Sequence, residues 1–68
     1  MKISYCTKRN AAGWRKKLIV DTDKKQFSRE STHWFCREDF AEVSIGDFRR
    51  MLEKVEKEGY TQVDFLTP

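Results

Sequence analysis

The chain has 68 residues, of which 38% are hydrophobic and 37% are charged, and its formal net charge is +3. A chain of this length has room for one domain with a thin core, since a domain of about 60 residues buries only roughly 60% of the surface of its unfolded chain. Its two Trp, two Tyr and five Phe favour a folded state over disorder. We therefore expect a single domain that spans residues 1–68.

The sequence shows no pattern typical of an export signal or a membrane span. The first residues lack the apolar run of a signal peptide, and no stretch approaches the roughly 18 apolar residues of a membrane span. These features predict a cytoplasmic protein without a membrane partner. In that reducing compartment the two cysteines, Cys6 and Cys36, are expected to be free thiols. The sequence does not decide whether they lie near each other.

The order of apolar patterns along the chain predicts an α+β fold with a small antiparallel sheet of three to four strands. Apolar residues alternate with polar ones near the N-terminus, and Leu18-Ile19-Val20 is a mostly β-branched run that ends in the turn signal Asp21-Thr22-Asp23-Lys24. Strands are predicted at about 2–8, 14–21 and 25–29, with 33–36 or 40–43 as alternatives for a fourth.

One helix, at about 45–58, is predicted from several independent signals. Ser44 is a favourable N-cap, and Asp47 completes an S-x-x-[DE] capping pattern. Gly59 suits the left-handed position that follows a helix, and Tyr60 can then close on Val55. One stripe of the helix is apolar, so we expect it to pack on one face of the sheet, followed by a short extended tail. The stripe consists of Ile45, Phe48, Met51, Leu52 and Val55.

Positive charge is concentrated in the first part of the chain. Residues 1–29 contain nine Lys or Arg against two Asp, a net charge of +7, whereas residues 30–68 contain five against nine, a net charge of −4. This asymmetry favours an acidic partner, and nucleic acid, DNA or RNA, is the commonest one. The predicted nucleic-acid-binding residues are Lys8, Arg9, Trp14, Arg15, Lys16, Lys17, Lys24, Lys25 and Arg29.

In this interpretation the cations contact phosphates without strong sequence specificity, and Trp14 or Tyr5 can stack on a base. Side chains alternate along a strand, so Trp14 and Lys16 share one face while Arg15 and Lys17 share the other. The simpler alternative is a solvated basic edge, because lysines on edge strands prevent sheets from associating. The layout resembles, in architecture alone, small DNA-binding modules such as the arm-binding domains of phage and transposon integrases and coactivator-type single-strand binders.

Catalysis and metal binding have little support in the sequence. His33, Cys36 and Cys6 are the residue types that bind zinc, but a fourth ligand would have to be an acid such as Glu38 or Asp39. The chain has one His and no glycine-rich phosphate loop. We therefore predict a non-enzymatic protein with no cofactor and no metal.

A protein partner is the alternative function. His33, Trp34 and Phe35 form an aromatic segment that could contact another protein, because Trp and Tyr dominate the binding energy of many interfaces. Such a protein would be a small interaction module or inhibitor of the kind that a phage or other mobile element encodes. A thin core also makes a homodimer a reasonable expectation.

Overall fold

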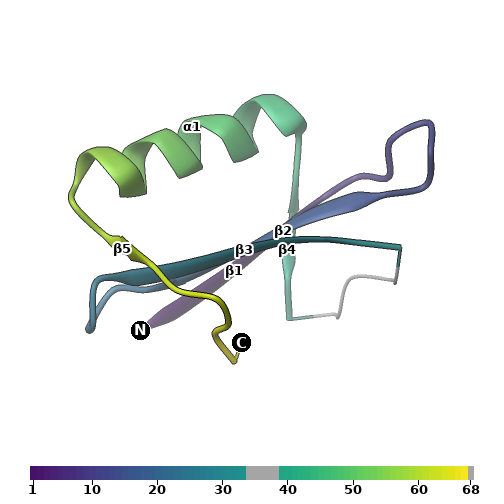
Figure 1. Cartoon of the computed structure of the whole chain (residues 1–68). Helices are drawn as coiled ribbons and strands as arrows, with labels where there is room; N and C mark the ends of the chain where they lie inside the picture. The colour runs from purple at the N-terminus through teal and green to yellow at the C-terminus, as the bar shows by residue number, and fades with distance from the viewer. Residues whose placement is uncertain (34–38, 68) are drawn as a thin grey trace.

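The computed structural model describes residues 1–33 and 39–67. It confirms the predicted α+β fold: a sheet with a single helix across one face (Figure 1). The elements are β1 (Lys2–Thr7), β2 (Arg15–Asp21), β3 (Gln26–Thr32), β4 (Ala41–Val43), α1 (Ile45–Lys57) and β5 (Thr61–Gln62). Of the two alternatives for a fourth strand, 40–43 corresponds to β4, and 34–36 lies outside the described residues.

The sheet has five strands in the order β4-β1-β2-β3-β5. Its three central strands pair antiparallel, as predicted. The two short outer strands, β4 and β5, pair parallel with β1 and β3, so the sheet is mixed and larger than predicted. The strands of a parallel pair need a long connection, and here the chain reaches each outer strand only after a loop or a helix.

The two hairpin connections lie at opposite ends of the sheet (Figure 1). The β1–β2 loop rises beside the start of α1, and the β2–β3 turn lies near the N-terminus of the chain and the end of α1. In the β2–β3 turn, Asp21 Oδ1 accepts hydrogen bonds from the backbone N–H groups of Asp23 at 3.1 Å and Lys24 at 3.2 Å. The turn chemistry expected of this segment is therefore present.

Both predicted ends of the helix are confirmed. The Ser44 hydroxyl accepts a hydrogen bond from the Asp47 N–H at 3.1 Å. At the other end Gly59 has a φ of 84°, and the N–H groups of Gly59 and Tyr60 bond to the carbonyls of Glu56 and Val55. These two bonds form a Schellman motif. No helix among the described residues is long and apolar enough to cross a membrane.

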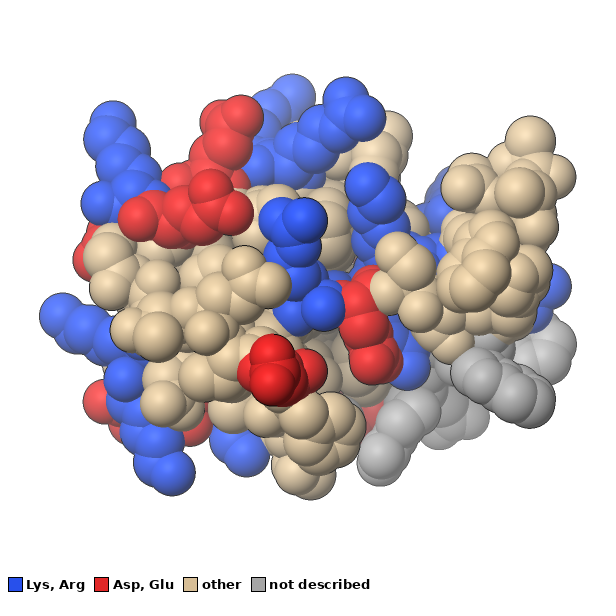
Figure 2. Space-filling model, viewed as in Figure 1, with Lys and Arg blue, Asp and Glu red and all other residues tan. Residues whose placement is uncertain are grey.

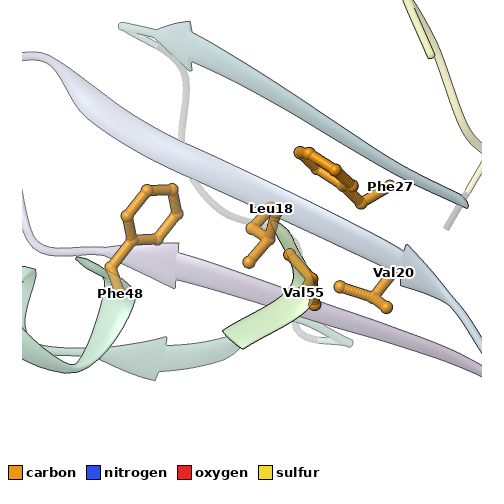
Figure 3. Packing of buried hydrophobic residues seen from close by; sticks show 5 residues of the cluster. All are labelled: Leu18, Val20, Phe27, Phe48 and Val55. Atoms are coloured by element: carbon orange, nitrogen blue, oxygen red, sulfur yellow. The ribbon is translucent and has the colours of Figure 1, made fainter. Parts of the chain in front are cut away.

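The main core lies between α1 and the sheet. Leu18 and Val20 of β2 and Phe27 of β3 pack against Phe48 and Val55 of the helix (Figure 3). Met51 and Leu52 are partly buried against this cluster. Ile45, which the apolar stripe places in the core, is instead 45% exposed. The stripe is therefore buried along most of α1 but not in its first turn.

The opposite face of the sheet carries a second, smaller cluster of Cys6, Ile19 and Phe40, with Leu66 against it. Cys6 is fully buried and disulfide-bonded, so the prediction of a free thiol is wrong for this residue. The other cysteine of the sequence, Cys36, lies outside the described residues. The thin core of a small domain supplies little stability, and a disulfide adds to it chiefly by restricting the unfolded chain.

Removing the N-cap should weaken the helix. We expect Ser44→Ala to lower the free energy of unfolding by about 1 kcal/mol, because the Asp47 N–H loses its acceptor. Ser44→Asn, which restores a capping oxygen, should retain most of the stability. Urea denaturation followed by circular dichroism measures both changes, and equal stability of the two variants would contradict this role of Ser44.

Stability should depend on Asp21 at acid pH. The hydrogen bond from the Lys24 N–H lowers the pKa of Asp21 most. The Asp23 N–H and the positive charges of the N-terminus and Lys2 lower the pKa further, whereas burial raises it. The pKa of Asp21 therefore lies below its ordinary value of 3.8. A lowered folded-state pKa contributes stability above the unfolded pKa, and that stability is lost as the pH falls through the folded pKa.

We therefore expect the melting temperature of the wild type to fall below about pH 4, and Asp21→Asn to lack this part of the decrease. The amide keeps an acceptor oxygen for the turn but does not titrate. Thermal melts between neutral and acid pH compare the two proteins. Parallel curves would mean that Asp21 does not make this contribution.

Candidate nucleic-acid interface

Two adjoining hollows lie on the helix side of the sheet and share Lys16 and Arg49. The larger, of about 640 Å³, lies at the β1–β2 loop, β4 and the start of α1; the smaller, of about 350 Å³, continues along β3 and the helix. We call them together the basic groove. Its cationic residues are Lys8, Arg9, Lys16, Arg29 and Arg49, and its acidic residues are Glu30 and Glu42.

The same feature is visible on the molecular surface. Figure 2 shows Lys and Arg side chains in the notch between the helix and the uncharged surface of the β1–β2 loop. Further cations are scattered over the opposite end of the molecule, where acidic side chains are mixed with them. Cations therefore line the groove together with two acidic residues, and cations and acids are also mixed at the opposite end.

The β1–β2 loop is held by its own hydrogen bonds, and this fixes the side chains beside the groove. Asn10 Oδ1 accepts from the N–H groups of Ala12 at 2.9 Å and Trp14 at 3.0 Å, and the Asn10 N–H donates to the Trp14 carbonyl at 2.9 Å. Gly13 has a φ of 84°, which favours glycine. Where β2 begins, Thr7 Oγ1 accepts from the Lys16 N–H at 2.9 Å.

Ion pairing separates the groove cations into two groups. Arg29 lies 3.9 Å from Glu56, whereas no ion-pair partner is found for Lys8, Lys16 or Arg49 among the described residues. All three of these side chains belong to exposed residues. Three cations without an ion-pair partner in the described part of the chain therefore converge on one concave surface, from a loop, a strand and a helix.

Arg15 and Lys17 do not lie in the groove, because alternation along β2 directs them to the opposite face of the sheet. Each of these side chains is only 16% exposed and is paired with an acid, Arg15 with Glu42 at 3.6 Å and Lys17 with Glu30 at 3.4 Å. Lys17 Nζ also lies 5.4 Å from the centre of the Phe40 ring. These cations neutralise the two acids that border the groove and help to hold the sheet.

Lys24 and Lys25 are also apart from the groove, since they lie in the β2–β3 turn at the far end of the sheet. Of the predicted nucleic-acid-binding residues, the structure brings five together around the groove and places four elsewhere. The five are Lys8, Arg9, Trp14, Lys16 and Arg29.

Arg49 is a groove residue that sequence reasoning missed. It lies in a helix with mixed surface charge, and the sequence pattern assigns it to the solvated face. Its position beside Lys16 results from the packing of α1 on the sheet, which brings the first turns of the helix next to the β1–β2 loop. The one signal in the sequence was that Arg49 directly follows Phe48, a residue of the apolar stripe.

The aromatic residues around the groove are Trp14 and His33. Trp14 is 42% exposed and lines the larger hollow. The centres of its ring and the His33 ring are 3.8 Å apart, with an angle of 55° between the planes. His33 therefore supports Trp14 from one side. Trp34 and Phe35, the other residues predicted to contact a protein partner, lie outside the described residues.

The basic-edge alternative does not apply to Lys16, because β2 is the central strand of the sheet. Lysines on a central strand do not protect an open edge from association. Arg29 differs, because β5 pairs only with Gln26 and Phe27 and leaves the rest of β3 as an edge.

The described residues include no group of three or more His, Cys, Asp or Glu that could hold a metal ion. Cys6 cannot act as a thiolate ligand while it is disulfide-bonded. Cys36 and Glu38, which the sequence offers as further ligands, lie outside the described residues.

Comparisons with known proteins give no relative from which to infer a function: no protein-family model, no curated protein and no solved structure matches the chain. A function must therefore be inferred from the chemistry of the groove itself.

The two neighbouring residues Arg15 and Lys16 should respond differently to substitution. Arg15→Gln is expected to lower the free energy of unfolding by about 1 kcal/mol or more, because a largely buried side chain loses its contacts with Glu42 and with Cys6 Sγ. Lys16→Gln, at an exposed residue, should change stability by less than about 0.5 kcal/mol. Urea denaturation of both variants makes the comparison. A larger loss for Lys16→Gln would contradict this assignment of the two side chains.

Proposed function

We propose that this protein is a non-enzymatic nucleic-acid-binding protein and that the basic groove is its binding surface. The observation that carries the proposal is the convergence of Lys8, Lys16 and Arg49, which lack acidic partners among the described residues, beside the exposed ring of Trp14. Like charges that converge repel one another, and a polyanion relieves this repulsion when it binds.

The chemistry of the groove favours contacts with the backbone of the nucleic acid. Lys and Arg that neutralise phosphates release condensed counterions, which gives affinity without sequence readout. The acids of the groove, Glu30 and Glu42, are each paired with a cation, so they oppose a phosphate less than free carboxylates would. We therefore expect binding with little dependence on sequence and a strong dependence on salt.

Charge reversal in the groove tests the proposal. Lys16→Glu combined with Arg49→Glu should weaken the binding of short fluorescein-labelled DNA and RNA by about tenfold or more at low salt, measured by fluorescence anisotropy. The slope of log affinity against log salt should become less negative by about 0.7 to 0.9 for each phosphate that the variant no longer neutralises.

A matched control separates the groove from the overall charge of the protein. Lys24→Glu combined with Lys25→Glu changes the net charge by the same amount at the far end of the sheet. We expect this control to keep most of the wild-type affinity. Equal losses in both double variants, or no binding of any nucleic acid by the wild type at low salt, would contradict the proposal and favour the alternative of a protein partner.

We propose a cytoplasmic location, where nucleic acid is abundant. The disulfide at Cys6 is the observation that opposes this location, because disulfides are rare in cytosolic proteins and persist in oxidising compartments. Because Cys6 is fully buried, the test is alkylation in denaturant immediately after acid quenching of source cells: a Cys6 that is alkylated without a reductant supports the cytoplasm, and one that is alkylated only after reduction supports export.

A further inference from the structure

The apolar part of the groove is as unusual as its charge. Among the described residues four large hydrophobic side chains are exposed: Met1, Trp14, Ile45 and Phe65. Two of them, Trp14 and Ile45, line the same hollow, although they belong to a loop and to a helix. Val43 of β4 lies beside them and is partly buried. The larger hollow therefore combines an apolar lining with the cations of the groove.

Ile45 does not need to be apolar for the fold that we observe. It continues the helical stripe of Phe48 and Val55, yet it is 45% exposed and not part of the core cluster. A polar residue is the more usual choice at an exposed position in the first turn of a helix. An exposed Ile45 that lines the same hollow as an exposed Trp14 instead forms a surface that an apolar or aromatic ligand group can cover.

We infer that the basic groove prefers single-stranded nucleic acid to duplex, because the hollow lined by Trp14 and Ile45 receives an unpaired base while the cations contact the flanking phosphates. This inference rests on the proposed function and names its substrate class. The volume of the hollow, about 640 Å³, lies in the range of pockets that enclose small ligands.

The duplex is disfavoured because of where its bases lie. In a double helix the faces of each base are stacked on neighbouring bases, and only the edges are accessible in the grooves. A base that enters a hollow and stacks on an indole ring must first leave the stack. In a single strand the faces are already available, and stacking on an aromatic side chain then adds to the phosphate contacts.

Contacts within the protein restrict the position of Trp14 before binding. The loop hydrogen bonds to Asn10 hold its backbone, and the contact with His33 supports its ring. A ring that is already ordered loses little conformational freedom when a base stacks on it, which favours affinity. This preorganisation is what a stacking platform requires.

The test compares three probes of equal length by fluorescence anisotropy at low salt: a labelled single strand, the same strand in a duplex, and an abasic strand that keeps the phosphates and lacks the bases. The wild type should bind the single strand most tightly. Trp14→Ala should weaken single-strand binding by about tenfold and leave duplex binding nearly unchanged. The abasic strand should bind the wild type about as weakly as the ordinary strand binds Trp14→Ala.

Phe65→Ala is the matched control, because Phe65 is an aromatic residue with 70% exposure that does not line the groove. It should bind all probes like the wild type. Trp14→Phe, which keeps a smaller ring, should bind the single strand more tightly than Trp14→Ala. If circular dichroism shows that Trp14→Ala is unfolded, the abasic probe and Trp14→Phe still decide the outcome.

Three results would overturn the inference: duplex binding as tight as single-strand binding, equal binding of the abasic and ordinary strands, or equal effects of Trp14→Ala and Phe65→Ala. Each of these leaves the proposed function intact, since nucleic acid still binds. If none of the probes binds the wild type, the proposed function itself is wrong.

Discussion

The contact on which the rest of the structure depends is the packing of Phe48 and Val55 of α1 against Leu18 and Val20 of β2. These side chains join the one helix to the central strand of the sheet, and a domain of this size has little other apolar area to bury. Leu18 is fully buried in this contact. This contact therefore places α1 over one face of the sheet and determines the point along β2 where the helix ends its coverage.

The groove is a consequence of that limited cover. A helix of 13 residues is about 20 Å long and cannot extend over the strands and the β1–β2 loop as well. Helical order starts at the Ser44 cap, so Ile45 and Arg49 lie at the margin of the core, opposite Trp14 and Lys16. The fold thus leaves a concave margin where loop, strand and helix meet, and a binding surface there needs no additional element.

Features defined by neighbouring residues were predictable from the sequence, whereas the parallel pairing of the outer strands was not. The ends of α1 follow from local hydrogen bonds at Ser44 and Gly59, which a short sequence pattern encodes. The short strands β4 and β5 pair in parallel with segments far away in the chain, and nothing local specifies such pairs. The same is true of Arg49, whose neighbours in the groove come from β1, the β1–β2 loop and β2.

Alternation along β2 was evident in the sequence, but its functional meaning required the position of the helix. The position of α1 decides which face of β2 is the core side, and therefore whether Arg15 or Lys16 lies in the groove.

The departures from simple folding rules coincide in space. An apolar helix position is exposed at Ile45, a tryptophan is exposed at the end of a tight loop, and cations meet without acidic partners among the described residues. Exposed apolar surface and unpaired cations contribute little to folding, and sequences that fold well depart from folding rules mainly where a function requires it. Their coincidence in one hollow is therefore better explained by a ligand that is both anionic and aromatic than by charge or hydrophobicity alone.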